Sequence, residues 1–217
     1  MSATVLYMSM SLDGFIAGPN VRPDNGLGDG GQRLHDWIIP SVQGATNQQV
    51  LNELMSTGAV VAGRRTFEPA GGWNGDHHGG VPIYILSRHA APDWAANWPL
   101  VHYVSSLEAA IQDARQAAGD RNVLVHGSSI AQRAIAAGLL DELEIHLVPV
   151  LLGDGLRLFE HLGAHPRELE HMRTLEGNGG ITHLRYRIRR CACLDDNVLI
   201  AAQNPGQHPQ RPFEHRA

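Results

Sequence analysis

The stretch VLVHGSSIAQRAIAAGLLDELEIHLVPVLLGDGLRLF, residues Val123 to Phe159, indicates the fold class more clearly than any other part of the chain. A short apolar run leads into the small-residue turn His126–Ile130, a helical pattern follows over Ser129–Ala137, and Leu143–Val148 alternates like a strand. A small-residue turn before a helix start leaves backbone N–H groups and the positive helix end available to an anion. The stretch therefore predicts a β–α–β unit with a phosphate-binding turn.

A second turn of the same kind lies upstream, where Ala59–Ala62 runs into Gly63, Arg64, Arg65 and Thr66. Glycine permits a tight turn, the threonine offers a hydroxyl and an amide, and an arginine can form paired hydrogen bonds with phosphate oxygens. The alternative is a plain helix start with solvated arginines. Two such turns in one domain predict a ligand with more than one phosphate.

Ser87 and Arg88 follow another apolar run, Ile83–Leu86. An arginine at a strand end is usually a solvated side chain. Paired with Arg64, however, Arg88 would bring two cations near one ribose, and this favours a 2′-phosphate and hence NADP over NAD. The downstream turn at Gly127 lacks the GxGxxG spacing, so we expect a nucleotide-binding fold other than the Rossmann fold, or only a serine-capped helix.

The rest of the chain repeats the alternation of strand and helix. Five short apolar runs are typical of strands buried on both faces: Val5–Met10, Val60–Ala62, Ile83–Leu86, Leu100–Val104 and Val123–Val125. Helical periodicity occurs at Gln48–Met55 and Leu107–Ala118. Glu168–Leu175 and Thr182–Arg189 alternate around a glycine-rich turn and predict a hairpin. These patterns predict an α/β fold with a mixed, mostly parallel sheet and helices on both faces.

Composition limits the domain count and the partners. A chain of 217 residues with 43% hydrophobic content can bury one substantial core, and we expect one domain over residues 1–190 followed by a tail at 191–217. The net charge of −5 and the scattered basic residues predict no binding to nucleic acid. Small molecules are the expected partners.

The expected location is the cytoplasm. Cys191 and Cys193 are too close together for an ordinary disulfide and too few for a closed zinc site, and free thiols fit a reducing compartment. We expect the N-terminal residues to form neither a signal peptide nor a membrane span. No metal site is expected, because the histidines lack ligand spacing and His77 and His78 would point to opposite faces of a strand.

One carboxylate stands out as a candidate for chemistry. Asp13 follows the first strand and precedes a flexible glycine, so it could orient a substrate amine or donate a proton; the alternative is an ordinary turn residue. The glycine-rich loop Gly71–Gly80, which contains Trp73, lacks a periodic pattern and is expected beside the site.

The motifs SMSLDGFIA, VAGRRTFE, VPIYILSR, the segment from VHGSS to GDGLRLF and the closing hairpin together resemble the dihydrofolate reductase-like family. Within it, the chain is similar to the C-terminal reductase domain of the bifunctional riboflavin deaminase-reductase. The resemblance covers residues 3 to 190 and implies a dihydrofolate reductase-like three-layer sandwich, a homodimer, and NADPH lying across the strand ends.

The resemblance also implies roles for particular positions. Asp13, Asp36 and Trp37 would bind the substrate. Asp36 is the nearest candidate for the buried acidic residue of folate reductases, and the alternative for Asp36 is a solvated helix charge. The positions implied to bind the cofactor are Ile16 and Ala17 at the nicotinamide, Gly63, Arg64, Arg65 and Thr66 at the phosphates, Ser87 and Arg88 near the adenosine ribose, and Gly127, Ser128, Ser129 and Ile130 at the pyrophosphate.

The sequence therefore favours an NADPH-dependent oxidoreductase that transfers hydride to a small heterocyclic substrate, pterin-like or ribosylaminouracil-like, or to another carbonyl or imine compound. The alternative is a nucleotide-binding protein of the same fold without turnover, with a regulatory or stress role. A flavin-linked role is a third, minor possibility.

Overall fold

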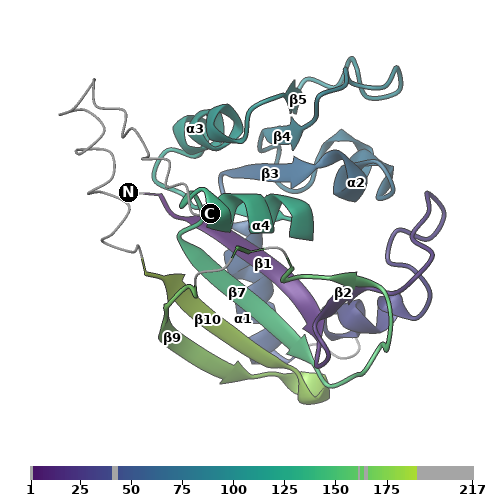
Figure 1. Cartoon of the computed structure of the whole chain (residues 1–217), viewed down its shortest axis with the longest axis vertical. Helices are drawn as coiled ribbons and strands as arrows, with labels where there is room; N and C mark the ends of the chain where they lie inside the picture. The colour runs from purple at the N-terminus through teal and green to yellow at the C-terminus, as the bar shows by residue number, and fades with distance from the viewer. Residues whose placement is uncertain (1, 41–43, 161, 164–165, 190–217) are drawn as a thin grey trace, which may run out of the picture.

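The computed structural model describes residues 2–40, 44–160, 162–163 and 166–189. Its main sheet contains eight strands: β1 (Thr4–Ser11), β3 (Ala59–Gly63), β4 (Ile83–Leu86), β5 (Val101–Val104), β6 (Val123–His126), β7 (Glu142–Val148), β9 (Leu169–Glu176) and β10 (Thr182–Ile188). The strand order is β5-β4-β3-β6-β1-β7-β10-β9 (Figure 1). Strands β5 to β7 in this order pair in parallel, whereas β10 is antiparallel to both β7 and β9. The expected mixed sheet with a closing hairpin is confirmed.

Helices cover both faces of the sheet. The helical segments are α1 (Ala45–Met55), α2 (Arg64–Phe67), α3 (Leu107–Ala118) and α4 (Ser128–Ala136), with 3₁₀ turns η1 (Gly31–Ile38), η2 (Gly71–Gly75) and η3 (Asn178–Gly180). Helices α3 and α4 pack on one face, and α1 lies behind the sheet with η1 (Figure 1). The expected three-layer arrangement is confirmed.

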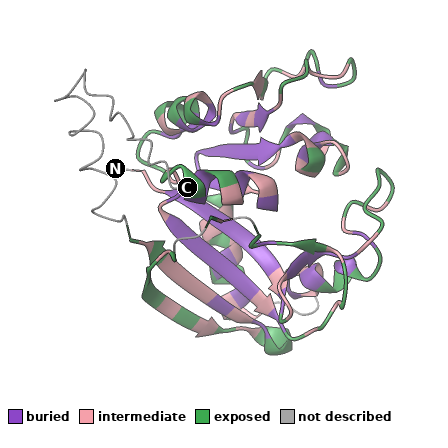
Figure 2. Ribbon diagram, viewed as in Figure 1, coloured by how far each residue is buried: buried purple, intermediate pink, exposed green. Residues whose placement is uncertain are grey.

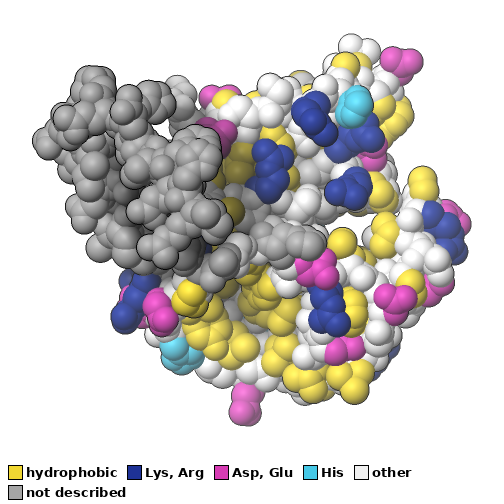
Figure 3. All heavy atoms as spheres, in the orientation of Figure 1, with side chains coloured by type: hydrophobic (Ala, Val, Ile, Leu, Met, Phe, Trp, Pro, Cys, Tyr) yellow, Lys and Arg dark blue, Asp and Glu magenta, His cyan; other side chains and the backbone are white. Residues whose placement is uncertain are grey.

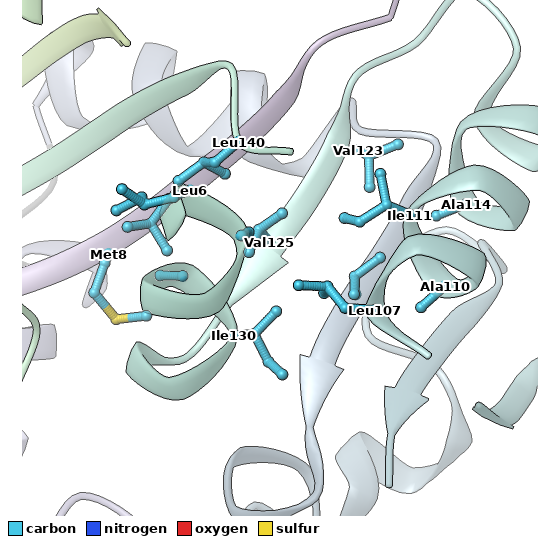
Figure 4. Packing of buried hydrophobic residues seen from close by; sticks show 14 of the residues in the cluster. Leu6, Met8, Leu107, Ala110, Ile111, Ala114, Val123, Val125, Ile130 and Leu140 are labelled. Carbon is cyan, nitrogen blue, oxygen red and sulfur yellow. The ribbon is translucent and has the colours of Figure 1, made fainter. Parts of the chain in front are cut away.

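Alternation along the strands divides the core between the two faces. Leu6 and Met8 of β1 join the cluster under α3 and α4 (Figure 4), while Val5 and Tyr7 join the cluster on the opposite face. Because both faces are covered, the central strands are buried along their length, whereas the outer strand β9 is mostly exposed (Figure 2). This is why the central strands read as continuous apolar runs and the hairpin alternates.

The sequence patterns missed a second, two-stranded sheet. Strand β2 (Phe15–Ala17) pairs antiparallel with β8 (Leu156–Arg157). Strands of two or three residues carry too little alternation to be recognised from sequence. The pairing matters because it brings the segment after β1 against the segment after β7.

The prediction for the C-terminal part of the chain is not tested by the helices and strands described above. The predicted tail, with Cys191 and Cys193, lies outside the described residues, and the division into a domain at 1–190 and a tail at 191–217 stays a prediction. Within the described part of the chain, no helix is both long and apolar enough to cross a membrane.

A buried polar layer lies between α1, η1 and the antiparallel strands. Nδ1 of His146 and Nδ1 of His183 are 3.0 Å apart, so one ring donates to the other, and His183 Nε2 lies 3.2 Å from Asn47 Oδ1. Both histidines are almost completely buried. Burial lowers the pKa of His183 to about 4 and holds the pKa of His146 well below its usual value. The two rings are therefore neutral in the folded protein.

These lowered pKa values predict acid destabilisation. In the unfolded chain a histidine takes up a proton near pH 6.5, but in the folded chain His183 does so only near pH 4. The free energy of unfolding should therefore fall as the pH drops from about 6.5 to about 4, by about 3 kcal/mol for His183 alone. Urea unfolding at a series of pH values measures this slope. H183Q should flatten it, whereas the control H89Q, at an exposed histidine, should leave it unchanged; an unchanged slope in H183Q would contradict the assignment.

Candidate active site

A cavity of about 550 Å³ lies at the carboxyl ends of the central strands, where open α/β sheets bind their ligands. Its walls come from β2, from residues 21–27, from η1, from the region of α2 and η2, and from the turn between β6 and α4. Figure 3 shows the molecule notched at this place, between the part that carries α2 and the part that carries β2. Segments far apart in the sequence thus form one site.

Several residues predicted to bind the cofactor line this cavity together: Ile16, Ala17, Arg65, Thr66 and Gly127. Ile16 and Ala17 reach it from β2, the strand that the sequence patterns missed. Arg65 and Thr66 belong to α2, directly after β3, and Gly127 follows β6. Because β3 and β6 are neighbours in the sheet, the turns that follow them lie side by side.

The two glycine turns are in direct contact. Gly127 has φ +96°, in the left-handed region that favours glycine, and a Cβ at this position would overlap the hydroxyl oxygen of Thr66. On the other side, a Cβ on Gly63 would lie 3.3 Å from Ser129 Oγ and from Ile130 Cγ1. Gly127 therefore suits this position in two ways, through its positive φ and through its contact with Thr66.

The start of α4 supplies free amide groups at this contact. The first backbone hydrogen bond at this end of the helix runs from Ala131 N to Gly127 O, at 3.1 Å. The N–H groups of Ser128, Ser129 and Ile130 therefore have no acceptor within the helix, and no side chain of the described residues caps them. Three amides beside a positive helix end suit a pyrophosphate group.

A second, smaller cavity of about 340 Å³ adjoins the ends of β4 and β5 and is lined by Leu86, Ser87, Arg88, Ser105 and Arg133. Basic side chains gather on the surface in this part of the molecule (Figure 3). Ser87 and Arg88, which were expected near the adenosine ribose, lie together in this cavity. Ser87 already holds its own turn, because its hydroxyl donates to His89 O at 2.9 Å and accepts from His89 N at 3.0 Å.

Sequence reasoning missed Ser105 and Arg133 in this second cavity. Ser105 follows β5 as Ser87 follows β4, and this repeated pattern could have revealed it. Arg133 lies on α4, where an arginine normally reads as a solvated helix residue. Arg64, which was expected beside Arg88, lines neither cavity; its Nε lies 3.6 Å from Glu68 Oε2.

Asp13 does not line the main cavity and is held by the loop after β7. Its Oδ1 accepts from Ser11 Oγ at 2.6 Å and from Leu152 N at 3.2 Å, and its Oδ2 accepts from Gly153 N at 2.8 Å. These hydrogen bonds, with that of Ser11 first, lower the pKa of Asp13 to about 2. The carboxylate is therefore ionised, and its role toward a substrate stays a prediction.

Asp36 and Trp37 also lie outside the cavity lining. Asp36 pairs with Arg33, while Trp37 is buried and its Nε1 donates to Ser9 Oγ at 2.9 Å. The residue before them, His35, lines the cavity instead. The 3₁₀ geometry of η1 turns these consecutive side chains in different directions, and no sequence pattern identified this segment as a 3₁₀ helix. The substrate roles of Asp36 and Trp37 stay predictions.

The loop Gly71–Gly80 reaches the cavity as expected, through Gly71 and Trp73. The prediction that His77 and His78 point to opposite faces of a strand is wrong. The segment is not a strand, and Nδ1 of His77 and Nδ1 of His78 are 2.7 Å apart. The reason is the succession of left-handed residues in this loop, which curls the chain. Among the described residues, no group of three or more His, Cys, Asp or Glu side chains could hold a metal ion.

His126, at the end of β6, is a cavity residue that sequence reasoning passed over. Its ring centroid lies 5.8 Å from those of Trp73 and His77. Burial, followed by the effect of His35, lowers its pKa to about 4, and burial lowers the pKa of His77 to about 3. Both imidazoles are neutral at physiological pH.

Comparison with solved structures supports the fold. A putative riboflavin biosynthesis protein from Shewanella sp. PV-4 matches with a TM-score of 0.66 and 24% identity, over 87% of this chain and 99% of that one. A pyrimidine reductase-like protein from Corynebacterium diphtheriae matches with a TM-score of 0.62 and 14% identity, over 88% and 92%. RibD from Acinetobacter baumannii matches with a TM-score of 0.60 and 16% identity, over 88% of this chain and 59% of that one.

No match was found among curated proteins. The family model described as the RibD C-terminal domain matches residues 3–182. This range includes the strands β1 to β9, both glycine turns and all the residues that line the main cavity. The resemblance expected from the motifs is confirmed, and the chain belongs to the RibD C-terminal domain family.

Proposed function

We propose that this protein is an NADPH-dependent reductase that transfers hydride to a carbonyl, an imine or a pterin-like ring of a small heterocyclic substrate. The observation that carries the proposal is the contact between the two glycine turns, where no side chain fits at Gly127 and the amides of α4 are free. Family membership and the reductase-like names of similar proteins support the reaction class.

The residues of both cavities fit a phosphorylated dinucleotide. Arg65, Thr66 and the amides at the start of α4 would hold the pyrophosphate. Ser105 and Arg133, with Ser87 and Arg88, would hold a 2′-phosphate. All four residues line the second cavity. When bound, the cofactor supplies the hydride, and Ile16 and Ala17 would border its nicotinamide.

The reaction also needs a proton at the oxygen or nitrogen of the reduced bond. Asp13 is ionised, with a pKa of about 2, and holds the Leu152–Gly153 turn through two backbone N–H groups. We therefore propose that Asp13 orients the substrate and that water donates the proton. Water can act as the acid when no protonated side chain is available.

A nucleotide-binding protein without turnover is the second candidate, and one observation favours it. The carboxylates expected at the substrate, Asp13 and Asp36, are absent from the cavity lining. Calorimetry with NADPH tests the binding that both candidates share. Consumption of NADPH, followed at its near-ultraviolet absorbance with a panel of pterins, aminouracils and carbonyl compounds, is expected only for the reductase.

Removing the arginines of the second cavity should reveal the cofactor preference. The double variant R88A/R133A should weaken NADPH at least about tenfold and leave NADH within about twofold, because only NADPH carries the 2′-phosphate. Titration calorimetry measures both constants. The control R121A removes an exposed arginine that lines neither cavity and should change neither constant. Equal losses for the two nucleotides would contradict the assignment.

Replacing Asp13 by asparagine tests its role. D13N keeps the shape of the side chain but loses the charge that three hydrogen-bond donors now stabilise. We expect kcat to fall about tenfold or more and the Kd of NADPH to stay nearly constant, because Asp13 lies outside the cofactor cavity. Steady-state kinetics and calorimetry on the same preparation separate the two effects. An unchanged kcat would contradict the orienting role proposed for Asp13.

A further inference from the structure

The outer strands of the main sheet have one polar and one apolar face. On the polar face, Arg185 of β10 lies 3.4 Å from Glu53 of α1, and His183 contacts Asn47 of the same helix. The side chains that alternate with these point to the other face. They belong to the cluster under α3 and α4, and they are Leu143, Ile145, Leu184, Tyr186 and Ile188. Helix α1 covers the polar face, so the apolar face needs a cover of its own.

No helix of the described residues covers this apolar face at the hairpin. Helices α3 and α4 contact β3, β4 and β6, whereas Figure 1 shows no helix in front of β9 and β10. Leu184, Tyr186 and Ile188 are accordingly only half-buried. Hydrophobic side chains gather on the surface in this part of the molecule (Figure 3). An apolar patch of this kind usually marks an interaction site.

A further cavity, of about 290 Å³, opens on this face. Its walls come from α4, β7, the hairpin β9–β10 and the segment after β8, and they include Ile135, Leu143, Phe159, Leu162, Leu169 and Ile188. Phe159 and Leu169 are 38% and 42% exposed. Aliphatic side chains placed here would remove this apolar surface from water, which is favourable.

One charged side chain, that of Arg167, also lines this cavity. Among the described residues it forms no ion pair and no hydrogen bond, and its Nε is enclosed without a partner. An enclosed guanidinium nitrogen needs an acceptor, and a carboxylate is the best one. We therefore expect an occupant that combines apolar side chains with a carboxylate.

The last described residues of the chain lie at the wall of this cavity. Ile188 lines it, and Arg189 N donates to Glu168 O at 2.9 Å, directly beside Arg167 in the sequence. The chain continues from this point at Arg190. The residues that follow therefore begin close to both the apolar wall and the unpaired guanidinium.

The sequence after Arg189 contains the expected combination of side chains. Asp195 and Asp196 precede Val198–Ala202, the longest apolar run in residues 190–217. Six extended residues span at most about 20 Å, which is enough for Asp195 to reach Arg167 from Arg189. The family model ends at residue 182, so family membership assigns no role to this segment.

We propose that residues 195–202 of this chain bind the cavity beside α4 and the hairpin. Val198, Leu199 and Ile200 lie against its apolar wall, and Asp195 or Asp196 pairs with Arg167. The inference is independent of the proposed reaction, because none of the described lining residues belongs to either cavity assigned to the cofactor. A second copy of the chain is the competing occupant, and cross-linking distinguishes the two.

Cross-linking in the full chain tests the position of the segment. In a C191S/C193S background, P166C places a thiol at the cavity and A201C places one in the segment. This pair should form a disulfide within one chain at least about tenfold faster than the control pair Q112C/A201C, whose first thiol lies on the exposed side of α3. Mass spectrometry of non-reduced peptides measures both rates. Equal rates would overturn the proposal, as would a disulfide between two chains, which would place a second copy on this face.

Charge reversal in the same cross-linking pair tests the role of Arg167. R167D should slow the disulfide about threefold, the effect of losing one partly exposed ion pair, and R167D/D195R/D196R should restore the rate. The control R121D reverses an exposed arginine that does not line this cavity and should leave the rate unchanged. An unchanged rate in R167D, or no recovery in the compensated variant, would overturn the pairing.

Removal of the segment should expose the apolar face. A chain that ends at Arg189 should bind the dye 8-anilinonaphthalene-1-sulfonate with several-fold higher fluorescence, whereas a chain that ends at Gln203 should match the full chain. The full-length variant V198S/L199S/I200S makes the same test without shortening the chain, and its control is P209S/P212S/F213S. Circular dichroism verifies that each variant is folded. Unchanged dye fluorescence in the folded V198S/L199S/I200S variant would overturn the proposal.

Discussion

The close approach of Gly127 to Thr66 is the constraint on which the site depends. Because β3 and β6 pair in parallel, the turns that follow them emerge at the same edge of the sheet, and a Cβ added to Gly127 would overlap the Thr66 hydroxyl. The left-handed backbone at Gly127 aims the start of α4 at this contact. Two local turns, each unremarkable alone, thereby become one surface of free amides, a hydroxyl and an arginine.

The arginines of the antiparallel strands and the residues that line the main cavity differ in their charge partners. On the side of α1, Arg173 pairs with Glu53 and Arg185 pairs with Glu142, and these pairs surround the buried Glu144. Burial raises the pKa of Glu144 against the opposing effect of Arg173. The arginines of the antiparallel strands are thus engaged far from the cavity. The lining of the main cavity, by contrast, contains the charged side chains of Arg65 and Asp24 among mostly apolar and neutral polar residues.

Much of the fold could be predicted from the sequence. The strands at Val5, Val60, Ile83 and Val123 and the closing hairpin lie where their patterns indicated, because burial on both faces or on one face leaves a direct mark on residue order. The strands β2 and β8 and the 3₁₀ turn η1 could not be found, since they are too short for a periodic pattern and depend on contacts with distant segments.

The candidate site divides in the same way. Strand–turn–helix junctions at Gly63 and Gly127 are local, so the sequence by itself determined that this protein has an α/β sheet with two such junctions, which we predict to bind anions. Only the tertiary structure decided that Asp13 holds the Leu152–Gly153 turn and that His126 and His35 face the cavity. The physical reason is that the direction of a side chain and its hydrogen-bond partners depend on groups brought together by strand order, over separations that no local pattern records.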